Sequence, residues 1–184
     1  MAGLARDIDA VLFIGYHGKA GTPRSVMAHT ISGAVVADVR CNGRSLGELG
    51  LNTALAAHSG VPPVLVAGDD SVAAEAAEVA PGMRAVVVKR ALGARAAALL
   101  HPDEACDRIE QEVPRALADR EAVRPVRFDG PVVLEVQVFR TRMTEHAMLI
   151  PGMELADGCT LRYPAPDFPT AYQVADLIAL LGGL

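Results

Sequence analysis

Three short, wholly apolar runs separated by helix-length segments constrain this fold more than any other feature of the sequence. They lie within residues 9–17 (DAVLFIGYH), 62–70 (PPVLVAGDD) and 83–90 (MRAVVVKR). A strand that is apolar on both faces is typical of a parallel sheet covered on both sides. Strands of this kind joined by helices predict an α/β fold, with a mostly parallel sheet flanked by helices.

The rest of the chain is read from turn signals and periodicity. A hairpin over 34–46 turns at Asn42-Gly43, a strong two-residue turn signal. We expect helices over 47–60, 71–80 and 167–181, and helix within 94–120, interrupted near Pro102 and Pro114. Beyond residue 130 the pattern predicts a half-exposed strand at 130–139, a short helix at 140–150 and an edge strand at 159–165. We therefore divide the chain into a core of residues 1–125 and a smaller C-terminal α/β lobe of residues 126–184.

The apolar composition of the first strand requires neighbouring strands to cover its edges. Residues 10–14 are all apolar, and an open sheet edge of that composition invites aggregation. We therefore expect neighbours on both sides of this strand, supplied by later strands or by a segment upstream of the chain.

Composition excludes several classes of protein. The net charge is −5 and no run of lysine or arginine stands out, so no electrostatic footprint for nucleic acid is present. The longest apolar stretch is far shorter than the roughly 20 residues of a membrane span. The first ten residues carry charges where a signal peptide would have its apolar segment, so they do not indicate a signal peptide. We expect a cytoplasmic protein without membrane contact. The three widely spaced cysteines form no CxxC pair, which predicts three small, buried apolar side chains.

Three side chains at the ends of predicted elements could meet over one site. His17 ends the first strand, the following loop returns to His29, and Glu48 opens the helix at 47–60. Ligands of α/β sheets bind at strand ends, and histidine and glutamate are zinc ligands. The alternative is structural: the histidines would bond to loop backbone, and Glu48 would be a first-turn charge favoured by the helix dipole.

Three further residues at strand ends are weaker candidates. Asp69 and Asp70 could bind a substrate ammonium group, or could instead cap the next helix. Lys89 could hold a carboxylate or could lie in solvent at the end of its strand.

Several of these motifs together resemble the D-aminopeptidases of peptidase family M55. The resemblance begins with FIGYHGKAGTP, MAHT and GRSLGELGLNTALAAHSGVPPVLVAGDD, and continues with VVVKRALGARAAALLHP, IPGMEL and AYQ in the same order. Such enzymes are zinc-dependent, self-compartmentalising homo-oligomers that remove N-terminal D-amino acids from short peptides, with two zinc ions in a complete site. The resemblance implies that His17 and Glu48 are metal ligands and that His29 is the catalytic histidine. Arg24 resembles a one-residue insertion between the two histidines.

The chain also departs from the family pattern. The family opens with an Asp-x-Glu and continues to an Asn-Asp-Ser-His stretch, and neither segment occurs here. We therefore expect a chain that resembles the C-terminal two-thirds of an M55 protein. Two functions follow as alternatives: a zinc aminopeptidase whose metal site is incomplete within this chain, or a non-catalytic relative that acts as a binding or assembly module without zinc.

Overall fold

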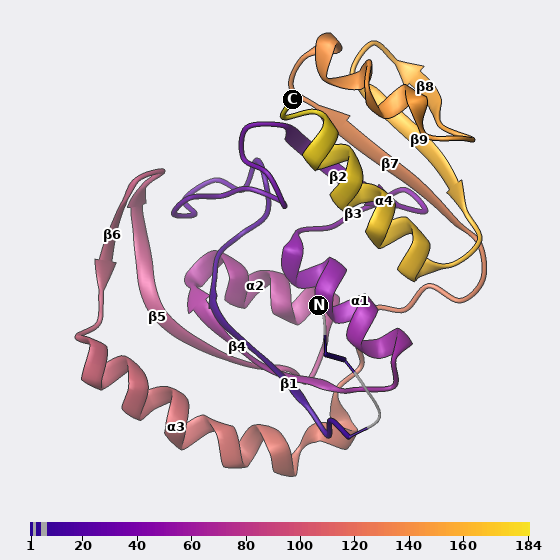
Figure 1. The fold of residues 1–184 in the computed structure, drawn as a ribbon. Helices are drawn as coiled ribbons and strands as arrows, with labels where there is room; N and C mark the ends of the chain where they lie inside the picture. The colour runs from indigo at the N-terminus through magenta and orange to yellow at the C-terminus, as the bar shows by residue number, and fades with distance from the viewer. Residues whose placement is uncertain (2, 5–6) are drawn as a thin grey trace.

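The computed structural model describes residues 1, 3–4 and 7–184, and it contains two sheets (Figure 1). The first, sheet A, has the strand order β1-β4-β5-β6; β1, β4 and β5 run parallel and β6 is antiparallel to β5. Its strands are β1 (Val11–Tyr16), β4 (Pro63–Asp69), β5 (Arg84–Gly93) and β6 (Ala96–Leu99). Every residue of β4 is buried, as a strand between two parallel neighbours and two covered faces requires.

The second, sheet B, is antiparallel, with the order β3-β2-β7-β9-β8. Its strands are β2 (Val36–Cys41), β3 (Arg44–Ser45), β7 (Val132–Val138), β8 (Glu154–Asp157) and β9 (Thr160–Ala165). Because β2 pairs with β7 and one hydrophobic core reaches both sheets, the expected division at residue 125 does not coincide with the boundary between the sheets.

Four helices complete the fold in layers. They are α1 (Glu48–His58), α2 (Asp70–Val79), α3 (Pro102–Ala118) and α4 (Phe168–Leu181). Helices α1 and α2 cover one face of sheet A and α3 lies alone on the other, while α4 packs on sheet B and against α1 (Figure 1). The predicted α/β fold is confirmed. Among the described residues, no helix is both long enough and apolar enough to cross a membrane.

The predicted hairpin turn, helix end and helix cap are confirmed where a residue with a specific conformational preference is present. The β2–β3 hairpin turns at Asn42-Gly43, both in the left-handed region with φ of 50° and 77°. Helix α1 is followed by Gly60 at φ 78°, a conformation that favours glycine after a helix. Asp69 caps α2, as its carboxylate accepts a hydrogen bond from the Val72 N–H.

Four expectations need correction. Residues 96–99 form β6, not helix, and α3 continues through Pro114 without a break. Because α3 buries only Ala116, water can solvate the carbonyl that Pro114 leaves free. Residues 140–150 form two short 3₁₀ helices, not one helix (Thr141–Thr144 and Ala147–Leu149).

The fourth correction concerns 159–165, because β9 lies inside sheet B between β7 and β8 instead of at its edge. Proline is tolerated there because β8 pairs only as far as Arg162, so Pro164 has β7 alone as its neighbour.

Later strands supply the first strand with one neighbour, and two of the cysteines differ from expectation. Within the described part of the chain β1 has β4 as its single partner, and Ile14 is 56% exposed. Of the three cysteines only Cys41 is buried; Cys159 is half-buried, and Cys106 is exposed because α3 lies on the surface.

Candidate metal centre

The loop that follows β1 is packed tightly against the start of α2. A Cβ placed on Gly18 would lie 2.5 Å from Ser71 Oγ and 3.0 Å from Ser25 Oγ, so a larger residue here would have to displace these two hydroxyl groups. The Gly18 N–H donates to Ser25 Oγ at 2.9 Å. His17, directly after β1, is thereby held at the carboxyl end of sheet A, where ligands of such sheets bind.

Asp69, at the end of β4, anchors the same loop through hydrogen bonds. Its fully buried carboxylate accepts hydrogen bonds from Ser25 Oγ (2.7 Å), Val26 N (3.2 Å), Ser71 Oγ (2.7 Å) and Val72 N (2.9 Å). Burial alone would raise the pKa of Asp69, but these four hydrogen bonds lower it overall. The arrangement fits the capping role, since each carboxylate oxygen is occupied twice.

The return of the loop to His29 is conformationally strained. Four non-glycine residues have positive φ in the described part of the chain, and three of them lie here: Arg24 (54°), Met27 (56°) and Ile31 (62°). A β-branched residue such as Ile31 is a marked outlier in that region. A hydrogen bond stabilises this backbone conformation, because the Ile31 N–H donates to Glu48 Oε1 at 2.9 Å. Strain of this kind, worth about 1–3 kcal/mol for each residue, clusters at functional sites.

Both histidines are oriented by backbone carbonyls. His17 Nδ1 lies 3.0 Å from Gly18 O, and His29 Nδ1 lies 2.7 Å from Met27 O. Because a carbonyl oxygen can only accept, each Nδ1 carries a hydrogen, and in the neutral ring each Nε2 then has the lone pair. Metal-binding histidines are commonly oriented in this way. The contacts predicted by the structural alternative are thus present, yet they leave the second nitrogen of each ring available.

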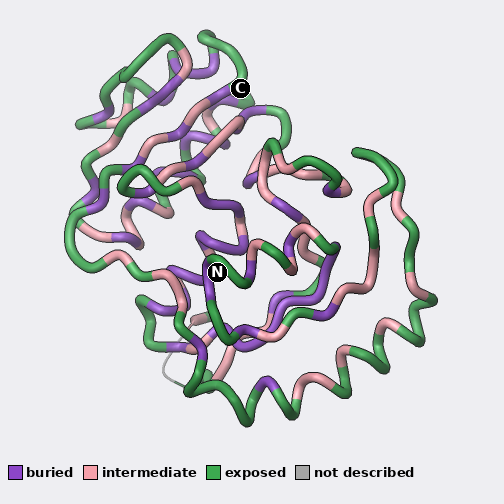
Figure 2. The backbone as a smooth tube through the Cα atoms, turned by 180° about the vertical axis from the view of Figure 1, so that it is seen from behind, coloured by how far each residue is buried: buried purple, intermediate pink, exposed green. Residues whose placement is uncertain are grey.

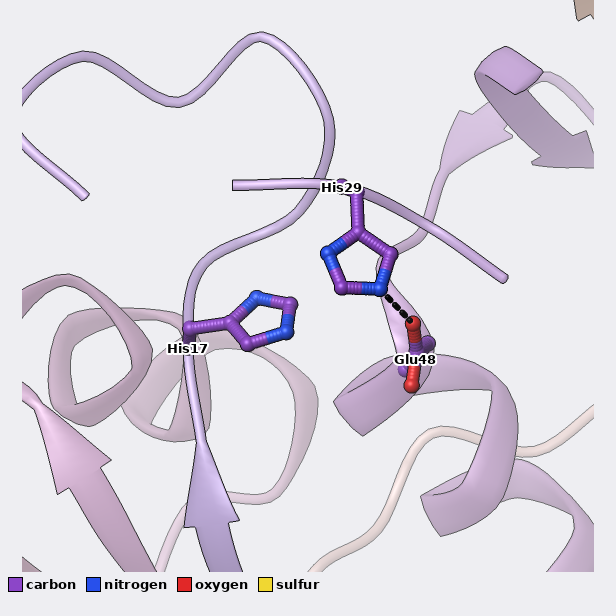
Figure 3. A group of neighbouring side chains, drawn as sticks. All are labelled: His17, His29 and Glu48. Atoms are coloured by element: carbon purple, nitrogen blue, oxygen red, sulfur yellow. Dashed lines mark ion pairs between the residues drawn. The ribbon is translucent and has the colours of Figure 1, made fainter. Parts of the chain in front are cut away.

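Glu48 completes a cluster of three side chains (Figure 3). His29 Nε2 lies 3.4 Å from Glu48 Oε1, and the His17 and His29 ring centroids are 4.4 Å apart. One potential ligand atom from each of the three residues lies within 4.8 Å of the other two. Two imidazoles and one carboxylate form a donor set that suits zinc. None of the described lysines or arginines forms an ion pair with Glu48, so its charge is available to a cation.

A hydrogen-bonded chain supports the helix that carries Glu48. The Asn52 amide donates to Tyr16 Oη, and Tyr172 Oη donates to Asn52 Oδ1, both at 2.8 Å. This chain joins β1, α1 and α4. Burial raises the pKa of both tyrosine hydroxyls, and the nearby Glu48 carboxylate contributes, so both phenols stay neutral. Tyr16, Asn52 and Tyr172 lie within GYH, GLN and AYQ, but no local pattern in the sequence indicates that their side chains meet.

The remaining predicted residues lie in different settings. Lys89 donates from Nζ to Gly15 O at 3.1 Å, which places its ammonium group beside the end of β1. Asp70 is exposed at the start of α2. The structure therefore brings His17, His29 and Glu48 together and leaves Asp69 and Asp70 outside that cluster.

A large open cavity begins at His29. Its volume is about 970 Å³, and it lies between the loop after β1 and the tip of the β5–β6 hairpin. Arg24 and Arg95, one from each wall, line it. The sequence does not reveal the hairpin wall, because its pattern predicts helix within 94–120.

Comparisons with known proteins agree with this geometry. The model of peptidase family M55, described as D-aminopeptidase, matches residues 1–177. A curated relative, the D-aminopeptidase of Bacillus subtilis (strain 168), is 35% identical over 172 residues, which cover 93% of this chain and 62% of the relative. A solved structure, the Zn-dependent D-aminopeptidase DppA from Bacillus subtilis, described as a self-compartmentalizing protease, superposes with a TM-score of 0.90. That match has 32% identity and covers 95% of this chain and 64% of the other. The chain thus spans somewhat less than two-thirds of the proteins it matches.

Proposed function

Because the chain belongs to the M55 family of D-aminopeptidases, we propose that it acts as a zinc-dependent aminopeptidase on short peptides with an N-terminal D-amino acid. The observation that carries this proposal is the convergence of His17, His29 and Glu48 within 4.8 Å at the end of sheet A. The three residues come from a strand end, a strained loop and a helix start. Such convergence from separate segments is what a functional site requires.

In this proposal His17 and Glu48 hold zinc, and His29 is the catalytic histidine. Bound zinc polarises a peptide carbonyl and lowers the pKa of a water molecule. The chain itself supplies orientation and proton transfer. The Nδ1–H of His29 is fixed on Met27 O, so its Nε2 lone pair can accept a proton beside the metal ligands. Lys89, at the end of β1, contributes a positive charge at the same edge.

The number of protein ligands favours a second candidate. A catalytic zinc site takes about three protein ligands and keeps one open position, whereas His17 and Glu48 supply two if His29 is reserved for catalysis. A non-catalytic relative that serves as a binding or assembly module without zinc follows from that count. Homo-oligomerisation is proposed for either candidate, since the structural match is described as self-compartmentalizing. A cytoplasmic location stays a prediction.

Zinc content and D-peptide hydrolysis test the proposal together. Purified protein, dialysed against zinc and then against buffer, should retain about one zinc ion or more per chain by mass spectrometry. His17→Ala should lose most of this zinc. His29→Ala should lose hydrolysis of D-Ala-D-Ala by at least about 100-fold. The matched control is His58→Ala, an exposed histidine at the end of α1, which should change neither quantity.

The outcomes separate the two candidates. Background zinc and no turnover in folded protein would refute the enzyme and support the binding module. Equal rates on D-Ala-D-Ala and L-Ala-L-Ala would contradict the stereochemical part of the proposal.

A further inference from the structure

The cavity beside His29 is lined by positive charge. Arg24 and Arg95 are its lining residues of fixed charge, and no carboxylate from the described part of the chain lines it. The chain as a whole carries a net charge of −5. Among the described residues neither arginine forms an ion pair, while six other arginines do. Two unpaired guanidinium groups in one hollow form a site suited to an anion.

The two walls that carry these arginines are fastened to each other. The Met27 N–H donates to Ala94 O at 2.8 Å, which ties the loop after β1 to the tip of the β5–β6 hairpin. The two segments also stand close together at one end of the ribbon in Figure 1. Ser25, next to Arg24, is bonded to the buried Asp69. Each arginine therefore extends from a braced segment, and less ordering is needed when an anion binds.

Apolar side chains occupy the space around the arginines. Met27 and Leu92 line the cavity and are 63% and 75% exposed. A volume of about 970 Å³ is at the upper end of the roughly 300–1,000 Å³ typical of small-molecule sites. The occupant that fits is a small molecule with a carboxylate at one end and short apolar side chains.

We propose that this cavity binds the C-terminal half of a di- or tripeptide, with Arg24 and Arg95 holding its free carboxylate. The inference rests on the proposed function, which places the N-terminal residue and the cleaved bond at His29. An extended peptide advances about 3.4 Å per residue, so the carboxylate of a di- or tripeptide, one or two residues on, lies about 3–7 Å beyond the cleaved bond. Arginine binds carboxylates in a bidentate manner that lysine cannot reproduce. The substrate class is therefore short peptides with a free carboxyl terminus.

Binding to zinc-free protein tests the site without turnover. Protein treated with a chelator and shown to be folded by circular dichroism is titrated with D-Ala-D-Ala and with D-Ala-D-Ala amide, using calorimetry or NMR shifts. The free acid should bind at least about tenfold more tightly than the amide, because it gains charge-assisted hydrogen bonds. Arg24→Ala and Arg95→Ala should each weaken binding of the free acid by about 10-fold to 100-fold, and the lysine variants should recover part of the loss.

A matched control comes from the same hairpin. Arg90 is exposed on β5 and lines a different hollow, so Arg90→Ala removes one positive charge from the hairpin without touching the cavity. It should preserve the preference for the free acid. A similar loss in Arg90→Ala would overturn the proposal, since net charge alone would then explain the effect.

Hydrolysis by zinc-loaded protein gives a second, separable readout. The ratio of kcat/KM for the acid to that for the amide should exceed ten and fall towards one in the Arg24 and Arg95 variants. Equal hydrolysis of acid and amide by the unaltered protein would overturn the carboxylate site and leave the aminopeptidase intact. If the zinc-loaded protein shows no turnover while the zinc-free protein still binds the free acid more tightly than the amide, the aminopeptidase is refuted and the carboxylate site is supported. Equal binding of acid and amide to the zinc-free protein would overturn the inference.

Discussion

Asp69→Ala separates two roles that the sequence allowed for this residue, substrate ligand and structural anchor. A substrate ligand would alter KM and leave stability near that of the wild type. The structure places the carboxylate fully buried with four hydrogen bonds, two to the start of α2 and two to the histidine loop. We therefore expect a large loss of stability.

The magnitude follows from these contacts. Removing a helix N-cap costs about 1 kcal/mol. Losing the bonds to Ser25 and Val26 strands a buried hydroxyl and a partly buried N–H, and each charge-assisted bond is worth about 1.5–3 kcal/mol before any overlap between them. We expect a total of about 3–5 kcal/mol, which for a chain of this length lowers Tm by roughly 10 °C. Urea unfolding followed by circular dichroism at pH 7 measures the free energy of unfolding.

Asp70→Ala is the matched control, because it removes an exposed carboxylate one residue later in the same helix turn. It should cost less than about 1 kcal/mol, the range of a helix-dipole contact. The deficit of Asp69→Ala should also depend on pH. The folded protein lowers the pKa of Asp69, so its contribution is full above the unfolded value of about 3.9 and is lost as pH falls through the folded value. A deficit equal to that of Asp70→Ala at pH 7 would refute the anchoring role.

Two further predictions address packing and thiol chemistry. Gly68→Ala should lose about 2 kcal/mol or more in urea unfolding, because its Cβ would lie 2.2 Å from Tyr16 O, a backbone atom. Gly93→Ala, with nothing within 4 Å, should stay within about 0.5 kcal/mol, and equal losses would contradict this account. Ellman's reagent should label two thiols in folded protein at pH 8, since burial raises the pKa of Cys41 to about 12 while Cys106 and Cys159 are accessible. Cys106→Ser should remove one of the two, and labelling of all three without denaturant would count against the buried Cys41.

The sequence was most informative where one local rule decides the structure. Asn42-Gly43 specified a turn that needs two left-handed residues, and the apolar run at 63–67 specified a strand with both faces covered. Prediction from the sequence failed where strand pairing outweighs the local preference of the residues. Residues 96–99 are three alanines and a leucine, good helix formers, yet pairing with the end of β5 makes them a strand.

The candidate site shows the same division. Histidine and glutamate at element ends pointed to the cluster that the structure forms. What the sequence could not show is how the loop reaches that cluster, because positive φ at Arg24, Met27 and Ile31 contradicts the ordinary preference of these residues. Only tertiary contacts hold such conformations. The arginine-lined cavity was missed for a related reason, since its second wall depends on a hairpin that propensity disfavours.

Sheet A has very unequal support on its two sides, and this determines how the molecule opens. Its α1 and α2 side belongs to the main core, whereas the α3 side has a small separate cluster of Val64, Leu65, Ala67, Val86 and Ala116. Helix α3 itself is mostly exposed (Figure 2). Detaching α3 opens a smaller apolar cluster than opening the α1 and α2 side would, so its amide hydrogens should exchange with solvent through a lower-energy excursion that leaves β4 intact. The outer helix thus forms a separate unit of cooperativity, able to fluctuate while the histidines stay in place.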